Sequence, residues 1–304
     1  MAVKTVQAIV NGVTTTLTLN SGTGKWEATI TAPATSSYNN NDGHYFPVTI
    51  KATDEAGNVT TKNDTDATLG SSLQLRVKEK TAPAITITYP TASALIINNK
   101  PAIHWKVTDN DSGVNPDTIG ITIDSGSKVT GSAITKTAIT GGYDCTYTPT
   151  TALADGSHTI KIDAADNDGN AATQKSVTFK IDTVPPTLSV TAPVNGLITN
   201  KAACTVTGTT NDITSSPVTV TVKLNSGSAE AVTVGADGSF SKALTLVSGS
   251  NTITVVATDS AGKSTTVTRT VTLDTVAPTI KAVTLTPNPV DAGKTYVISE
   301  EVTD

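Results

Sequence analysis

Acidic side chains in the turns of the middle part of the chain carry oxygens that could bind a metal ion. Five of them fall in two turns and a linker: Glu79, Asp109, Asp111, Asp166 and Asp168. Asp117 lies in the same expected loop as Asp109. A calcium ion takes about six to eight oxygen ligands, which two turns and a linker could supply together. The alternative is that each Asp only caps its own turn by accepting backbone N–H hydrogen bonds.

A smaller acidic set recurs further along the chain, at the next proline-containing junction. It consists of Asp182, Asp212 and Asp259. The same two interpretations apply to this set, although it offers fewer carboxylates. Bound calcium would stiffen a junction without performing a reaction.

Aromatic residues around one loop could form a binding surface. Tyr38, His44 and Tyr45 flank the polar segment 39–43. Loop aromatics can stack on sugars or anchor a protein partner. The alternative is that Tyr45 and Phe46 pack at a strand edge beneath the loop.

The sequence offers no recognisable catalytic arrangement. The three histidines, His44, His104 and His158, lie in different local contexts, and none has the spacing of metal ligands. No Gly-x-Ser-x-Gly elbow, phosphate-binding Gly-rich loop or His-Glu-x-x-His motif is present. We therefore expect a protein that is not an enzyme, with no cofactor other than calcium.

The composition determines which elements must position these residues. Hydrophobic residues make up 37% of the 304 residues and aromatic residues only 4%, so Val, Ile, Leu and Ala must build the core. Such cores suit short strands, where β-branched side chains pack on a pleated surface. Threonine alternates with apolar residues, as in residues 219–222, and no long helical period is present. The chain is expected to be all-β.

A short motif repeats three times and predicts a strand, a tight turn and a return strand. The copies are residues 50–58, 162–170 and 255–263. Each copy has an Asp that can cap the turn and, three residues later, a Gly that can adopt positive φ. Repetition of this unit predicts several similar domains.

Proline-containing junctions separate these domains. Asp182–Thr187 matches Asp274–Thr279, and residues 80–83 form a looser copy. Proline stiffens such a junction and blocks continuous strand pairing. The predicted domains are residues 1–82, 83–184 and 185–276, followed by an incomplete segment, 277–304, that forms a β-hairpin.

The hairpin and junction motifs resemble the bacterial immunoglobulin-like (Big-type) repeats of adhesins, surface proteins and phage tail proteins. The resemblance covers residues 83–276 and implies tandem immunoglobulin-like β-sandwiches in an extended array. In such a sandwich, two of the loops lie at the same end as the domain's N-terminus. The acidic turns near Asp109 and Asp166 are therefore expected to meet close to Glu79.

A narrower resemblance concerns both ends of the chain. Residues 1–8, 25–33 and 43–48 are similar to the start of immunoglobulin-like structural proteins of phages and of phage-tail-like particles of Gram-positive bacteria. Residues 286–294 resemble a C-terminal hairpin of such proteins. The resemblance implies a structural or binding spacer of a tail or baseplate, located in the virion or tail-like particle and assembled in the cytoplasm. Its expected partners are other virion or tail proteins and a host-surface polysaccharide or protein.

Charge and hydropathy limit the remaining partners. The net charge is −5 and basic clusters are absent, which argues against nucleic acid. Residues 1–20 lack the pattern of a signal peptide, and no run reaches the roughly 18 apolar residues of a membrane span. A fragment of a bacterial cell-surface adhesin or stalk remains the alternative. Cys145 and Cys204 are expected to be buried free thiols rather than a disulfide.

Overall fold

The computed structural model describes residues 2–304 and confirms the predicted all-β class. Two short 3₁₀ turns, Gly70–Leu73 and Gly131–Ala133, are the only helical elements within this range. The chain divides into two compact units, one ending at Ile181 and the other beginning at Asp182. Among the described residues, no helix has the length and apolar character needed to cross a membrane.

The first segment is built on one six-stranded sheet with the order β3-β2-β1-β4-β5, in which β6 pairs with the start of β4. The strands are β1 (Val3–Val10), β2 (Val13–Asn20), β3 (Lys25–Glu27), β4 (Phe46–Asp54), β5 (Val59–Lys62) and β6 (Gln74–Leu75). Val6 and Ala8 are two residues apart on β1 and are both buried, because alternate side chains share one face of a strand. Phe46 and Leu73 complete the small set of buried apolar side chains in this segment.

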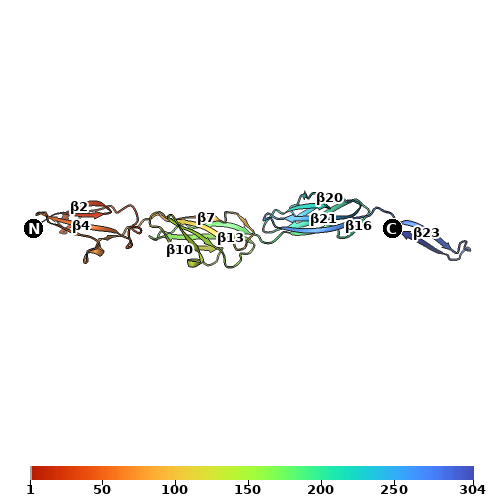
Figure 1. Ribbon diagram of the computed structural model, residues 1–304, viewed down its shortest axis with the longest axis horizontal. Coiled ribbons are helices and arrows are strands. Elements are labelled where there is room, and N and C mark those ends of the chain that lie inside the picture. Colours follow the sequence, from red (N-terminus) through yellow and green to blue (C-terminus); the bar gives the residue numbers. More distant parts are fainter. Residues whose placement is uncertain (1) are drawn as a thin grey trace. The chain divides into compact units, whose positions relative to one another are not determined.

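The second segment forms a two-sheet sandwich (Figure 1). One sheet has the order β11-β12-β9-β7 and the other the order β10-β13-β14-β8. The strands are β7 (Ala84–Tyr89), β8 (Leu95–Ile96), β9 (Ile103–Thr108), β10 (Val114–Ile123), β11 (Thr135–Ile139), β12 (Gly142–Tyr147), β13 (Gly156–Asp166) and β14 (Lys175–Ile181). On β9, Trp105 is fully buried while its neighbour His104 lies on the opposite face, as alternation requires. Trp105 and Phe179 are the largest fully buried side chains of this core.

The second unit contains another two-sheet sandwich. Its sheets have the orders β15-β17-β20 and β16-β22-β21-β18-β19. The strands are β15 (Thr187–Ala192), β16 (Leu197–Thr199), β17 (Ala203–Asn211), β18 (Thr219–Leu224), β19 (Glu230–Val232), β20 (Ser239–Thr245), β21 (Gly249–Thr258) and β22 (Ser264–Leu273). The core consists mainly of β-branched side chains around Phe240, in accord with the aromatic-poor composition.

The three copies of the repeated motif are confirmed as turns between antiparallel strands. In each copy the Gly donates its backbone N–H to the carbonyl of the Asp, at 3.1, 3.4 and 3.2 Å. The glycines have φ of +85°, +94° and +83° at positions 57, 169 and 262. Positive φ is unfavourable for residues with a Cβ, which explains the glycine at this position.

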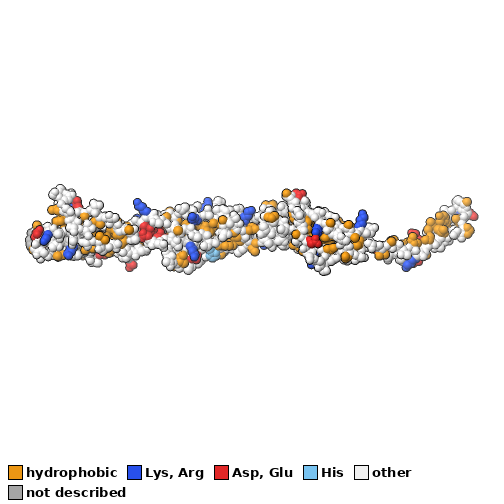
Figure 2. Space-filling view, turned by 90° about the horizontal axis from the view of Figure 1, so that it is seen from above, with side chains coloured by type: hydrophobic (Ala, Val, Ile, Leu, Met, Phe, Trp, Pro, Cys, Tyr) orange, Lys and Arg blue, Asp and Glu red, His pale blue; other side chains and the backbone are white. Residues whose placement is uncertain are grey.

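The C-terminal segment is an antiparallel pair of strands, β23 (Thr279–Thr286) and β24 (Val297–Thr303). Every residue of these strands is exposed except Thr303, which is half-buried. Hydrophobic side chains, including Val283, Leu285 and Ile298, lie on its surface (Figure 2). Two strands leave both faces open because no second layer of the described chain packs on them.

Both cysteines are free thiols, which confirms that they do not form a disulfide. Cys145 is buried on the same face of β12 as Tyr147, while Cys204 is half-buried. Burial raises the pKa of the Cys145 thiol to about 11, so this thiol stays protonated at neutral pH. A protonated, buried thiol contributes to packing rather than to nucleophilic chemistry.

Candidate metal centre

Asp166 ends strand β13 and is held in place by its own turn. Its Oδ1 accepts the backbone N–H of Asn170 at 2.7 Å, and its Oδ2 accepts the Asn170 side-chain amide at 2.6 Å. The residue is 1% exposed. Asp166 is therefore a rigidly oriented, buried carboxylate, because the turn that it caps fixes both oxygens.

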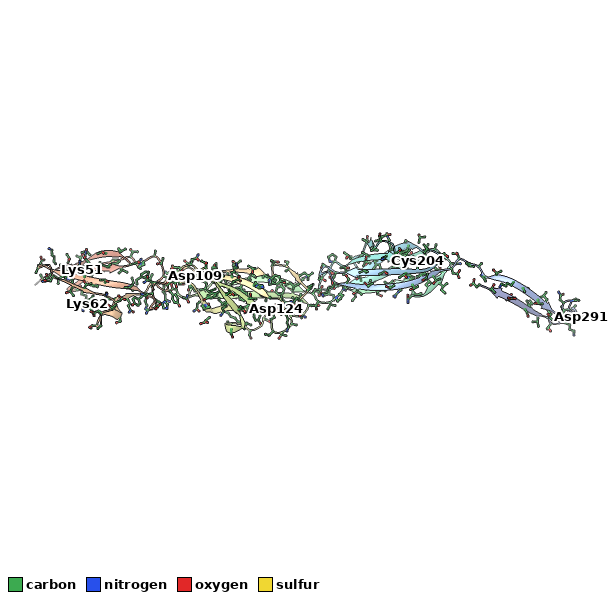
Figure 3. The ribbon with its side chains drawn as sticks, in the orientation of Figure 1. Lys51, Lys62, Asp109, Asp124, Cys204 and Asp291 are labelled. Carbon is green, nitrogen blue, oxygen red and sulfur yellow. The ribbon has the colours of Figure 1, made fainter. Side chains whose placement is uncertain are left out.

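Asp109 follows strand β9 and is positioned by a second turn. Its Oδ1 accepts the backbone N–H groups of Asp111 and Gly113, at 3.0 and 2.8 Å. Gly113 has φ of +81°, which allows the loop to fold back onto the carboxylate. Asp109 lies at the end of the second sandwich that receives the chain from the first (Figure 3). Its Oδ2 receives no hydrogen bond from residues 2–304 and stays open to a ligand.

Glu79 comes from the linker that precedes β7. Its Oε1 accepts the backbone N–H of Ser112 at 2.7 Å, so the linker is tied to the loop that also positions Asp109. The Glu79 carbonyl accepts the side-chain amide of Asn170 at 3.2 Å. These contacts bring the linker carboxylate between the two acidic turns.

The carboxylates of Glu79, Asp109 and Asp166 form one cluster, in which the possible ligand oxygens lie within 4.8 Å of one another. None of the three takes part in an ion pair with a Lys, Arg or His among the described residues. Three negative charges at this separation repel one another strongly in a partly buried site. A divalent cation with oxygen ligands would compensate that charge, and calcium suits this donor set.

Asp111 and Asp168, the other two predicted ligands, do not join the cluster. Asp111 Oδ1 accepts the backbone N–H of Ser36 at 2.9 Å, and Asp168 Oδ2 accepts the backbone N–H of Glu79 at 3.0 Å. The Asp168 carbonyl also accepts the Lys78 ammonium at 2.9 Å. Both side chains therefore hold the first segment and the linker against the second sandwich. Asp117 is exposed on β10 and lies outside the cluster.

Ser112 has a role that the sequence patterns did not predict. It is fully buried, and its backbone N–H binds Glu79 while its Oγ has no hydrogen-bond partner within the described part of the chain. The only feature of the sequence that pointed to this role is the position of Ser112 between Asp111 and Gly113, in a loop already predicted to be acidic.

The predicted aromatic group is half-buried rather than an open platform. The rings of Tyr38 and His44 stack at 4.0 Å between centroids, and His44 Nδ1 lies 2.5 Å from the Tyr38 carbonyl oxygen. The Tyr45 hydroxyl donates to Asp64 Oδ2 at 3.0 Å, and this hydrogen bond raises the pKa of Tyr45. Phe46, the next residue, is buried. The rings thus contact one another and the loop, and a partner-binding role for them stays a prediction.

Two known protein families match separate parts of the chain. Residues 91–183 match a family described as a bacterial Ig-like domain, and residues 186–275 match a family described as glucodextranase, domain B. No curated protein matches the chain.

Solved structures with similar folds include multidomain proteins. A three-domain structure of titin (I67–I69, an E-to-A variant) has 12% sequence identity, covers 90% of this chain and 88% of its own, and gives a TM-score of 0.46. The fibronectin(III)-like modules of Clostridium thermocellum CbhA have 20% identity, cover 63% of this chain and 94% of their own, and give a TM-score of 0.32.

The two-sheet sandwiches and the match of residues 91–183 to a bacterial Ig-like domain together support an immunoglobulin-like repeat architecture. The predicted fold, tandem immunoglobulin-like β-sandwiches, is confirmed. Ig-like domain families are generally non-catalytic, which suggests a structural or binding role for the matched residues.

Proposed function

We propose that the chain is a structural spacer of a phage tail, baseplate or tail-like particle. Its successive sandwiches suit this role, and the sequence resemblances at residues 1–8, 25–33, 43–48 and 286–294 support a place in such a particle. In this proposal the protein is assembled in the cytoplasm, joins other tail proteins, and performs no catalysis.

The observation that carries the proposal is the way in which the linker after the first segment is fixed. Backbone and side-chain groups of Glu79 bind Asp168 and Ser112 of the second sandwich. Ser36 of the first segment binds Asp111 on the other side of the same loop. A spacer must keep its domains from collapsing on one another, and several hydrogen bonds across a short linker limit that motion.

Calcium at the centre of Glu79, Asp109 and Asp166 is part of the proposal. An ion bound there would tie the linker carboxylate to the two turns of the second sandwich. Because the three residues come from three separate segments, one ion would replace their mutual repulsion with shared attraction. The expected effect is a stiffer linker.

Contacts with partners would come from two surfaces. The exposed strands β23 and β24 have unpaired edges that could add to the sheet of another subunit. The loop with Tyr38, His44 and Tyr45 is the candidate for weak, multivalent contacts with a host-surface polysaccharide or protein.

Intact-mass proteomics of purified particles from the producing strain tests the role. We expect the chain in the particle fraction, together with other tail proteins. Its recovery only from the cell-wall fraction, as part of a heavier polypeptide, would overturn the tail assignment and support a surface adhesin or stalk. Peptides from an unrelated cytoplasmic protein serve as the control for contamination of the particles.

A further inference from the structure

The second unit contains a separate acidic cluster that the proposed role does not use. The carboxylates of Asp182, Asp212 and Asp259 offer oxygens that lie within 4.8 Å of one another. Asp182 and Asp259 are only 1% and 6% exposed, and Asp212 is half-buried. Asp182 precedes β15, Asp212 follows β17 and Asp259 follows β21, so three separate segments meet here.

Asp259 differs from its counterparts in the other two copies of the repeated turn. In those copies the second carboxylate oxygen accepts the side-chain amide of the residue four positions later: Asn58 binds Asp54 at 2.9 Å, and Asn170 binds Asp166 at 2.6 Å. In the third copy that residue is Lys263, which supplies only its backbone N–H, to Asp259 Oδ1 at 2.8 Å.

Asp259 Oδ2 is therefore buried and has no hydrogen-bond partner among the described residues. A buried carboxylate oxygen without a partner is costly, because the protein does not return the hydrogen bonds that water would supply. Native proteins rarely leave such an atom unpaired, so the missing partner points to a ligand.

Of the other two carboxylates, that of Asp212 also has an oxygen that accepts no hydrogen bond from the described chain. Asp212 Oδ1 accepts the backbone N–H groups of Thr214 and Ser215, both at 2.8 Å, and its Oδ2 accepts no hydrogen bond from the described chain. Asp182 is held by the backbone N–H of Val184 and by the Ser215 hydroxyl. The turns thus orient the three carboxylates, while Asp212 Oδ2 and Asp259 Oδ2 accept no hydrogen bond from the described chain.

No Lys, Arg or His of the described residues forms an ion pair with this cluster. None of the ion pairs between residues 2 and 304 includes Asp182, Asp212 or Asp259. Two of these carboxylates are almost fully removed from water, which would otherwise screen their repulsion. The cluster therefore lacks both a counter-charge and, at Asp259 Oδ2, a hydrogen-bond donor.

We propose that Asp182, Asp212 and Asp259 bind a calcium ion. All of the donors are hard oxygens, and no His or Cys belongs to the cluster, which excludes a zinc-type ligand set. Calcium accepts irregular carboxylate arrangements, whereas magnesium requires near-octahedral geometry and retains most of its waters. The ion would tie the segment that leads into β15 to the two turns of the same unit. This inference does not depend on whether the chain belongs to a tail.

Calcium binding by the full-length chain tests the proposal, measured by isothermal titration calorimetry in metal-free buffer. The Asp109→Asn substitution is introduced first, so that the cluster around Glu79 does not contribute. To this background we add either Asp259→Asn or, as the matched control, Asp237→Asn. Asp237 is an exposed turn-capping Asp of the same unit, and among residues 2–304 its side chain accepts hydrogen bonds only from Ser239.

The chain with Asp109→Asn and Asp237→Asn is expected to bind one calcium ion. The chain with Asp109→Asn and Asp259→Asn is expected to lose this binding or to bind at least tenfold more weakly. Equal binding by the two chains, or no binding by the control chain, would overturn the proposal. Displacement of calcium by an equal concentration of magnesium would overturn the choice of ion.

Thermal unfolding separates loss of a ligand from loss of the fold. In the presence of a chelator, the chain with Asp259→Asn is expected to unfold at the same temperature as the chain that lacks this substitution, or at a higher temperature, because one repelling charge is removed. In excess calcium the order should reverse, since the bound ion stabilises only the intact cluster. A variant that is less stable in both conditions by the same amount would show a purely structural role for Asp259 and contradict the proposal.

Discussion

His158 shows how a single buried group makes the stability of this protein depend on pH. Its Nδ1 lies 2.8 Å from Asp124 Oδ2, and its Nε2 lies 2.7 Å from the Ala154 carbonyl oxygen. Burial lowers the pKa of His158, but the hydrogen bonds to Ala154 and Asp124 outweigh it, and the pKa is raised above 6.5. The protonated form is therefore favoured by folding.

The direction of the pH effect follows from this raised pKa. The stabilisation is fully present below the ordinary pKa of about 6.5, and it is lost as the pH rises through the higher pKa of the folded state. We expect Asp124→Asn to lower the unfolding temperature more at about pH 5 than at about pH 8, because the charged imidazole gains more from the carboxylate than the neutral ring does. Differential scanning calorimetry at the two pH values measures this difference. A substitution with the same effect at both pH values would contradict the assignment.

At the scale of elements, the three copies of the repeated turn share a backbone hydrogen bond but differ in the hydrogen bonding of the Asp side chain. Its Asp always accepts the backbone N–H of the residue four positions later, at 2.8, 2.7 and 2.8 Å in the three copies. The residue at that position decides whether the second carboxylate oxygen is satisfied. Asn58 and Asn170 satisfy it, and Lys263 does not. The backbone of the turn is thus the same in each copy, while the side chain four positions after the Asp decides whether a carboxylate oxygen is left available to a ligand.

The linker around Glu79 allows a test, at the scale of elements, of the calcium site proposed for Glu79, Asp109 and Asp166. Trypsin can cleave after Lys78 and Lys80, on both sides of Glu79. Because proteolysis follows the population of the opened linker, we expect calcium to slow these two cleavages by about tenfold. Glu79→Gln should remove most of that protection, since it removes the charge that the linker gives to the ion.

Peptide mapping by mass spectrometry over time measures the two cleavages. Cleavage after Lys62, in the first sheet and away from the linker, serves as the internal reference. The Asp237→Asn chain should keep the full calcium effect, because Asp237 belongs to neither cluster. Linker cleavage in the native protein at the same rate with and without calcium would disprove the proposed centre.

At the scale of the whole molecule, stability is divided between separate cores. The core around Trp105 and Phe179 and the core around Phe240 and Ile253 have no residue in common. They belong to the two different compact units. The chain should therefore unfold in more than one step rather than as one cooperative body.

Two core substitutions test this division. Trp105→Ala and Phe240→Ala each leave a cavity, and truncation of a large buried aromatic side chain costs about 3–5 kcal/mol. We expect each substitution to lower one thermal transition and to leave the other within about 0.5 kcal/mol, as is usual for sites that share no partners. Calorimetry of the full-length protein resolves the transitions. Equal shifts of every transition by both substitutions would show that the units fold together.

The sequence by itself determined the all-β class and the turns of the repeated motif. These features depend on local preferences: alternation at period two, an Asp that caps a turn, and a Gly that adopts positive φ. The match of residues 91–183 to a bacterial Ig-like domain agrees with the resemblance seen in those motifs. The boundaries of the domains and their place in a particle stay predictions.

Only the tertiary structure decided which carboxylates meet. The sequence predicted five acidic residues around the linker. Glu79, Asp109 and Asp166 converge. Asp111 and Asp168 instead bind backbone groups of the first segment and the linker. The unpaired Asp259 Oδ2 likewise became evident only when its burial was known. The sequence shows which turns carry carboxylates. The direction in which each carboxylate points depends on how the loops pack against one another, and residues distant in the chain make those contacts.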